Sequence, residues 1–143
     1  MIIDDKIKRL REFESKVESN IILLAKDLEH LILDMNRDQI EGSGVSNDNQ
    51  KITPKYTPFT VKIKKAKGQP TTHVTLHDTG EFLDSLFVVY GDHYFAIGAD
   101  DPKVKKLERK YGKDIFGLIE KNLRELIDLI RPELQEKFKK DVS

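Results

Sequence analysis

Four histidines, at positions 30, 73, 77 and 93, are the first side chains in this sequence that could bind a metal. His73 and His77 are four residues apart and Asp78 follows directly, a spacing that would bring ligands together on a helix. The segment between them, Val74-Thr-Leu76, is typical of an extended strand, in which this spacing need not place both rings at one ion. The sequence also contains no His-Glu-x-x-His pattern. We therefore expect neither a metal nor any other cofactor.

The tripeptide Asp78-Thr-Gly80 matches the surroundings of the catalytic carboxylate in aspartic proteases, including the dimeric, half-length ones. In such enzymes two Asp side chains share a proton and activate water. Ala96-Ile-Gly98 could supply the apolar-apolar-Gly triplet that should follow on another strand. However, an apolar strand should lead directly into the Asp, whereas His77 stands immediately before Asp78. Glu81 also occupies a position where these enzymes usually have a small residue. We expect a protein that is not an enzyme, and a dimeric protease remains an alternative.

Charge is segregated along a chain whose net charge is zero, with 25 Lys and Arg against 25 Asp and Glu. Residues 51–68 hold six Lys and no acid, whereas residues 78–101 hold six acids and no Lys or Arg. Solvated loops would explain this pattern, and so would complementary patches that join copies of the chain head to tail. The predicted contacts between subunits are Lys62, Lys64, Lys65, Lys67, Asp78, Glu81 and Asp84. For nucleic acid the lysines predict at most a non-specific contact, because no recognition-helix pattern accompanies them.

The composition sets limits on the class of protein. The chain has 143 residues, of which 38% are hydrophobic and 35% charged, a length and balance that suit one soluble domain covering residues 1–143. It contains no Cys, so disulfides, Cys-ligated zinc, iron–sulfur clusters and thiol nucleophiles are excluded. The acidic start of the sequence and the lack of a long apolar run predict neither a cleaved signal peptide nor a membrane span.

Two long helices are the main elements predicted to position these residues. Apolar residues recur in steps of three and four through residues 4–41, which predicts a helix that Gly42-Ser-Gly44 ends. The polar residues 42–56 predict a mobile loop. Thr57 before Pro58 predicts the N-cap of a short basic helix that reaches about residue 65, although alternating apolar residues there also permit a strand.

The region of residues 57–117 is predicted to carry a small sheet. β-Branched and aromatic residues predict a β-hairpin over residues 86–98. Asp101 is the predicted N-cap of a helix that ends at Tyr111-Gly112. A final helix is predicted over residues 118–140, with a kink or a break at Pro132. The predicted fold class is α+β, a small antiparallel sheet flanked by a long N-terminal and a long C-terminal helix.

The order of several short motifs resembles a known family. The motifs are Pro58-Phe-Thr60 with the lysines and Gly68 that follow it, Leu76-x-Asp-Thr-Gly-x-Phe-Leu-x-Ser85, the hairpin with Phe95-Ala96, Tyr111-Gly112, and Ile115-Phe-Gly-Leu118. Over residues 54–131 the chain is similar to bacteriophage head–tail joining and tail-completion proteins, also known as virion morphogenesis proteins. It departs from them at Asp114-Ile115, where the family often carries Arg-Pro.

This resemblance implies a structural subunit of the virion neck or tail, which assembles in the cytoplasm of the host bacterium. It implies a ring, often of six copies, between the connector on the portal side and the tail tube or terminator. Within its motifs, Thr79 and Ser85 would satisfy backbone groups at a turn and a helix start, and Gly80 would supply an unusual backbone conformation. The implied structural residues are Asp78, Thr79, Gly80, Ser85, Tyr111, Gly112, Phe116 and Gly117. A helical adaptor built on the two long helices is the alternative from another class.

Overall fold

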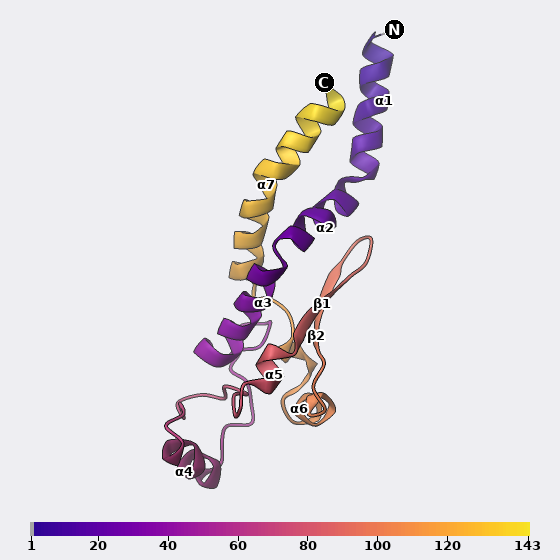
Figure 1. Ribbon diagram of the computed structural model, residues 1–143. Coiled ribbons are helices and arrows are strands. Elements are labelled where there is room, and N and C mark those ends of the chain that lie inside the picture. The colour runs from indigo at the N-terminus through magenta and orange to yellow at the C-terminus, as the bar shows by residue number, and fades with distance from the viewer. Residues whose placement is uncertain (1) are drawn as a thin grey trace.

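The computed structural model describes residues 2–143, so Met1 of the acidic N-terminus lies outside the described residues. The molecule is elongated, and both termini lie at the same end (Figure 1). There the first helix, α1 (Ile2–Ser15), runs beside the last helix, α7 (Glu120–Val142). The rings of Phe13 and Phe138 meet edge to face with centroids 5.2 Å apart. We call this pair of helix ends the arm.

The predicted N-terminal helix over residues 4–41 is wrong as one continuous element. It consists of α1, α2 (Val17–Asp27), α3 (Glu29–Arg37) and a π-helical segment, η1 (Asp38–Ser43). At each of the two breaks a backbone N–H bonds three residues back, Lys16 to Phe13 and Leu28 to Ala25. These tight bonds replace the regular pattern and change the direction of the helix (Figure 1).

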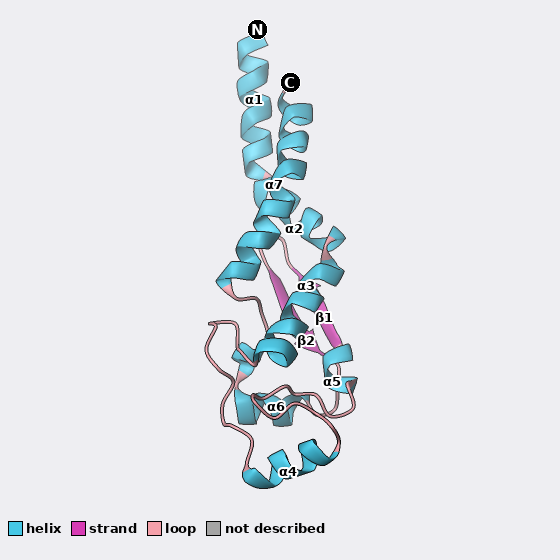
Figure 2. Cartoon of the chain, turned by 90° about the vertical axis from the view of Figure 1, so that its left-hand side faces the viewer, coloured by secondary structure: helices cyan, strands magenta, loops and turns pink. Residues whose placement is uncertain are grey.

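The hairpin is formed by β1 (Leu86–Tyr90) and β2 (Phe95–Ala99), one residue beyond the predicted end. The strands pair antiparallel, with Leu86 opposite Ala99 and Val88 opposite Ile97. Helices α2, α3 and α7 lie on one side of this sheet (Figure 2), and with the sheet they bury the upper core. The buried members of the upper core are Ala25, Ile32, Leu33, Met35, Leu86, Ile97, Leu118, Leu126 and Ile130. The fold class is α+β, as predicted.

A lower core joins the hairpin to the remaining elements. Its buried members are Ile40, Ile52, Val74, Phe82, Leu83 and Ile115. Residues 42–56, predicted as a mobile loop, are packed in part: Val45 and Ile52 are buried, and Val45 pairs with Lys51 in an isolated β-bridge. The apolar side chains within this polar segment hold it against the body, because their burial removes apolar surface from water.

The predicted basic helix is α4 (Pro58–Ala66), and the Thr57 side chain caps it by accepting a hydrogen bond from the Thr60 N–H at 3.2 Å. A single helical turn, α5 (Glu81–Asp84), leads into the hairpin. Helix α6 (Val104–Tyr111) begins later than predicted, and Asp101 is not its N-cap. The Asp101 carboxylate accepts a hydrogen bond from the Lys103 N–H at 2.8 Å, so it stabilises a turn that contains Pro102 and precedes the helix.

The 3-10 turn η2 (Lys113–Ile115) connects α6 to the final segment. Helix α7 then runs through Pro132 as one element, which rules out two abutting helices, one of the two predicted alternatives. Residue 128 loses the usual bond from the Pro132 nitrogen, a loss that an exposed helix position tolerates because water can satisfy the free carbonyl. Within residues 2–143, no helix combines the length and the apolar character needed to cross a membrane.

Candidate functional site

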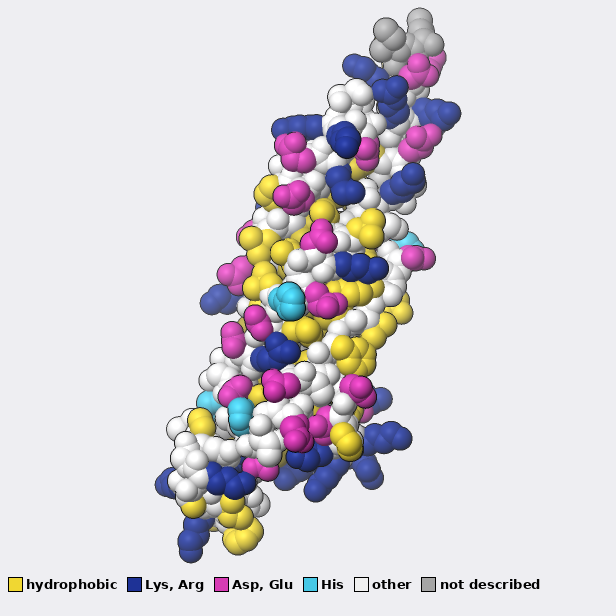
Figure 3. Space-filling view, viewed as in Figure 1, with side chains coloured by type: hydrophobic (Ala, Val, Ile, Leu, Met, Phe, Trp, Pro, Cys, Tyr) yellow, Lys and Arg dark blue, Asp and Glu magenta, His cyan; other side chains and the backbone are white. Residues whose placement is uncertain are grey.

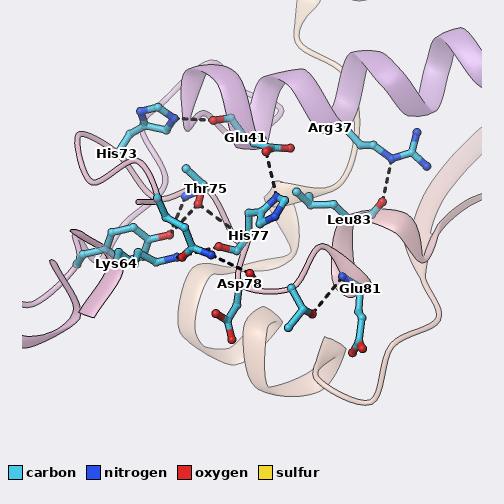
Figure 4. Close-up of polar contacts among 12 residues, drawn as sticks. Arg37, Glu41, Lys64, His73, Thr75, His77, Asp78, Glu81 and Leu83 are labelled. Atoms are coloured by element: carbon cyan, nitrogen blue, oxygen red, sulfur yellow. Dashed lines mark hydrogen bonds and ion pairs between the residues drawn. The ribbon is translucent and has the colours of Figure 1, made fainter. Parts of the chain in front are cut away.

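Hydrogen bonds hold the Leu76–Ser85 loop near both of its ends (Figure 4). Thr75, one residue before it, donates its N–H to the Tyr56 hydroxyl at 2.8 Å, and the Arg37 side chain donates to the Leu83 carbonyl at 2.9 Å. Leu76 adopts a positive φ of 53°, a conformation that non-glycine residues rarely take. The loop is therefore a rigid part of the body rather than a free surface turn.

The turn residues of this loop behave in part as the resemblance implies. Gly80 is the N-cap residue of α5. Its φ of 89° is a left-handed conformation that favours glycine. The Thr79 hydroxyl accepts a hydrogen bond from the Glu81 N–H at 3.4 Å. Ser85 does not serve a helix start: its hydroxyl donates to the Phe82 carbonyl at 2.7 Å and so closes the end of α5.

Lys64 of α4 is a buried charged residue, with 9% of its surface exposed. Its ammonium donates to the His77 carbonyl at 2.8 Å and to Gln69 Oε1 at 3.3 Å. It also lies 4.9 Å from the centroid of the Tyr56 ring, within the range of a cation–π interaction. Lys64, which was predicted to contact a neighbouring subunit, thus directs its ammonium group into its own chain.

Lys67 and Asp78 also meet within one chain, with Lys67 Nζ 2.7 Å from Asp78 Oδ1. This hydrogen bond, followed by the charge of Lys67, lowers the pKa of the Asp78 carboxyl below its ordinary value of 3.8. Weaker contributions in the same direction come from the charges of Lys103 and Lys64. Asp78 is exposed and ionised, and this internal ion pair engages a residue that was predicted to contact a neighbouring subunit.

The remaining predicted contacts are available at the surface. Lys62 and Lys65 on α4 and Glu81 and Asp84 on α5 are all exposed. Within residues 2–143, none of these four takes part in an ion pair. The structure thus divides the predicted set into three residues that stabilise the chain internally and four that remain open to a partner.

The second group of motif residues forms a joint between α6 and α7. Gly112, with a φ of 88°, follows Tyr111 and ends α6, and Phe116 packs near Phe82 with ring centroids 6.1 Å apart. The Gly117 N–H donates to the buried Asn36 Oδ1 at 3.0 Å, and the Gly117 carbonyl accepts from Gln39 Nε2 at 2.8 Å. The joint is therefore anchored on the N-terminal helical segment.

Asn36 and Gln39 were not singled out by the sequence analysis. Asn36 is fully buried and its amide also donates to the Ile115 carbonyl at 3.0 Å. Gln39 Oε1 accepts from the Ile119 N–H at 2.9 Å. Both residues lie in the segment 32–40, whose other buried members are mostly apolar. A polar side chain within an apolar stripe was the available signal, since a buried amide requires hydrogen-bonding partners.

The four histidines are distributed over the molecule. His73 Nε2 lies 2.6 Å from the Glu41 carbonyl oxygen, and His93 pairs with Glu18 on the arm side of the molecule. His77 Nδ1 is 3.0 Å from Glu41 Oε1, but the two atoms are not aligned for a hydrogen bond. His30 is exposed. Within residues 2–143, no three His, Asp or Glu side chains are grouped as a metal ion would require.

A cleft of about 370 Å³ lies between α4, the Leu76–Ser85 loop and α6. Lys103, the N-cap residue of α6, and Lys106 and Lys110 within the helix line it, together with Lys64 and the internally paired Asp78. These lysines were not among the functional residues predicted from the sequence. Their spacing of three and four residues, which places side chains on one face of a helix, was the signal that could have identified them.

Comparison of the chain with protein-family models, with curated proteins and with solved structures finds no match.

Proposed function

We propose that this chain is a structural subunit of a bacteriophage neck or tail that joins copies of itself head to tail into a ring. The main support is the orientation of α4, which buries Lys64 and exposes Phe59 and Ile63. Phe59 is 72% exposed and Ile63 is 40% exposed. A short helix that turns its apolar residues outward and a lysine inward is suited to contact with another protein.

Four of the exposed residues of α4 form what we call the donor face, namely Phe59, Lys62, Ile63 and Lys65. A second set has the matching chemistry and forms what we call the acceptor face, namely Glu81, Asp84, Phe87 and Val89. The first face combines two basic with two apolar side chains, and the second combines two acidic with two apolar side chains. Two different faces that complement each other favour a heterologous contact, which closes into a ring when the rotation between copies permits.

The environment of Asp78 supports a structural rather than a catalytic role for the Asp-Thr-Gly tripeptide. A shared proton in an aspartic dyad requires one carboxyl with a raised pKa, because two close carboxylates cannot both ionise. In the single chain the Asp78 carboxylate accepts a hydrogen bond from the Lys67 ammonium at 2.7 Å, so it would have to leave this ion pair to meet a second Asp78. Loss of peptide cleavage on Asp78→Ala, with purified protein and a peptide library, would instead support the protease.

A charge exchange tests the contact between subunits. Lys62→Glu with Lys65→Glu should dissociate the oligomer, as should Glu81→Lys with Asp84→Lys, and all four substitutions together should restore it. Lys121→Glu with Lys140→Glu, at exposed positions on α7, is the control for the change in net charge. Sedimentation velocity reports the size, and raised salt should weaken the wild-type assembly. A wild type that stays monomeric, or an exchange that restores nothing, would reject this interface.

The place in the virion requires a separate test. Disruption of the gene in a producing phage should leave filled heads and unattached tails in electron micrographs. Complete, joined particles from the disrupted strain would contradict the neck or tail role, whatever the oligomeric state of the purified protein.

A helical adaptor is the second candidate, and the arm favours it. Ile3, Ile7 and Leu10 of α1 are exposed by 44–65%, and Phe138 of α7 by 40%. The paired helix ends that carry these residues extend beyond the body (Figure 1). Removal of residues 2–12 would weaken binding to a partner under the adaptor hypothesis and would leave assembly through α4 intact under the ring hypothesis.

A further inference from the structure

We propose that the cleft between α4 and α6 binds the phosphate backbone of duplex DNA without sequence preference, through Lys103, Lys106 and Lys110. The proposal does not depend on the ring. It starts from the distribution of charge, since the two basic stretches of the chain, residues 51–68 and residues 103–113, both lie at the end opposite the arm (Figure 1).

The two stretches are strongly basic. Residues 51–68 hold six Lys and no acid, and residues 103–113 hold six Lys and Arg against the single acid Glu108. Figure 3 shows Lys and Arg side chains gathered at this end of the molecule. Because the whole chain has no net charge, the remainder carries a compensating excess of acid. The acidic stretch 78–101 lies between the two basic stretches in the sequence, and residues 51–113 as a whole still hold 12 Lys and Arg against seven acids. This region would therefore attract a polyanion.

Helix α6 provides a row of positive charge along the cleft. Lys103, Lys106 and Lys110 line the cleft, whereas Leu107 belongs to the residues packed on the lower core. Seven helical residues span about 10 Å, and phosphates of one DNA strand recur every ~3.4 Å along the axis. The row is therefore long enough for its ammonium groups to reach neighbouring phosphates of one strand.

These lysines have no ionic partner in their own chain. Within residues 2–143, no carboxylate lies within 4.0 Å of the side-chain nitrogens of Lys103, Lys106 or Lys110. Asp78, an acid that lines the cleft, is already bound to Lys67. A ligand phosphate would thus meet free ammonium groups and not have to displace an internal ion pair.

The chemistry of the cleft favours phosphates over bases. Its tyrosines are partly buried, and an ammonium lies over each ring: Lys64 over Tyr56 at 4.9 Å and Lys110 over Tyr111 at 5.3 Å. Neither ring offers an open platform for a base to stack on. The row itself is made of lysines, which act as point charges and do not read base edges as a bidentate Arg does. Binding should therefore be independent of sequence.

Fluorescence anisotropy with a labelled duplex of about 20 base pairs tests the proposal, at salt concentrations between about 50 and 200 mM. For the full chain we expect a dissociation constant on the order of micromolar at the lowest salt, equal for two unrelated duplex sequences. Lys103→Glu, Lys106→Glu and Lys110→Glu together should weaken binding at least about tenfold. They should also reduce the slope of log affinity against log salt by about 2.7, for three lost phosphate contacts.

The matched control reverses three exposed lysines at the other end of the molecule, Lys6, Lys8 and Lys16, which changes the net charge equally. This control should bind like the wild type. The neutral triple Lys103→Gln, Lys106→Gln and Lys110→Gln, checked for an unchanged melting temperature, covers the case in which the charge reversal unfolds α6. Equal loss in the α6 and control triples, or tighter binding of polyglutamate than of duplex, would overturn the proposal. So would a wild type that does not bind at the lowest salt.

Discussion

Lys67 Nζ and Asp78 Oδ1 lie 2.7 Å apart, so the basic helix α4 and the acidic Leu76–Ser85 loop meet within one chain. Opposite charges that the sequence places in two separate blocks thus stabilise the subunit at this point. The complementary pairing proposed between subunits must use the charges that remain free, at Lys62, Lys65, Glu81 and Asp84.

The pair makes stability depend on pH in the acidic range. Because Lys67 lowers the pKa of Asp78 below 3.8, the folded state holds the ionised carboxylate more firmly than the unfolded state does. The contribution is present above the unfolded pKa and is lost as pH falls through the folded pKa. Asp78→Asn should therefore be less stable than the wild type at neutral pH and equally stable once both are well below pH 3.8.

Urea denaturation at a series of pH values measures this difference. Asp84→Asn is the control, since Asp84 is exposed and has no ion pair among residues 2–143. Its stability relative to the wild type should not change across the same interval. A gap between Asp78→Asn and the wild type that persists at the lowest pH would argue against the ion pair.

Lys64 should contribute more to stability than its neighbour Lys65. Lys64→Met keeps an unbranched side chain but removes the donors to the His77 carbonyl and Gln69. The loss of hydrogen bonds from a charged donor should lower the free energy of unfolding by about 1–3 kcal/mol. Lys65→Met, at an exposed position, should change it by less than about 0.5 kcal/mol. Chemical denaturation compares them, and equal stabilities would contradict the buried position of Lys64.

Asn36 should be essential to the joint between α6 and α7. Asn36→Ala leaves the Ile115 carbonyl and the Gly117 N–H without partners, and an unsatisfied buried group costs about 1–3 kcal/mol. We expect a loss of about 2–5 kcal/mol in the free energy of unfolding, with faster amide exchange at Gly117. The control Asn20→Ala lies on a partly exposed position of α2 and should change stability by less than about 1 kcal/mol. Normal exchange at Gly117 in Asn36→Ala would refute this role.

The pKa of the Tyr90 phenol should be raised in the folded protein. Burial, followed by the hydrogen bond to Glu29 at 2.9 Å and the charge of that carboxylate, raises the pKa of Tyr90 above its ordinary value of 10.0. The folded state therefore gains stability from the protonated phenol below pH 10, and loses it as pH rises through the raised pKa.

The absorbance of tyrosinate at about 295 nm follows this titration, because it appears when the phenol hydroxyl of a tyrosine loses its proton. Tyr90→Phe should remove the step with the raised pKa from the curve and leave the other steps in place. Glu29→Gln should move that step to lower pH, because it removes the charge that disfavours tyrosinate. An unchanged curve for Tyr90→Phe would show that Tyr90 does not give the step with the raised pKa.

Local patterns in the sequence determined much of the fold. The apolar spacing of residues 4–41, the Thr57 cap with Pro58, the β-branched run at 86–90 and the glycines at 80 and 112 each act within a few residues of themselves. Their effect on the backbone depends on neighbours along the chain, so the sequence alone was enough to predict an α+β fold with these elements.

Tertiary contacts decided what the local patterns could not. The turn of α4 that buries Lys64 depends on the His77 carbonyl, 13 residues away, and the burial of Asn36 depends on Ile115, 79 residues away. Likewise, the amphipathic spacing of α6 places its lysines on one face, but only the packing of α6 opposite α4 makes that face a basic cleft. The partner of a side chain depends on the free energy of folding of the whole chain, which the residue spacing within one segment does not determine.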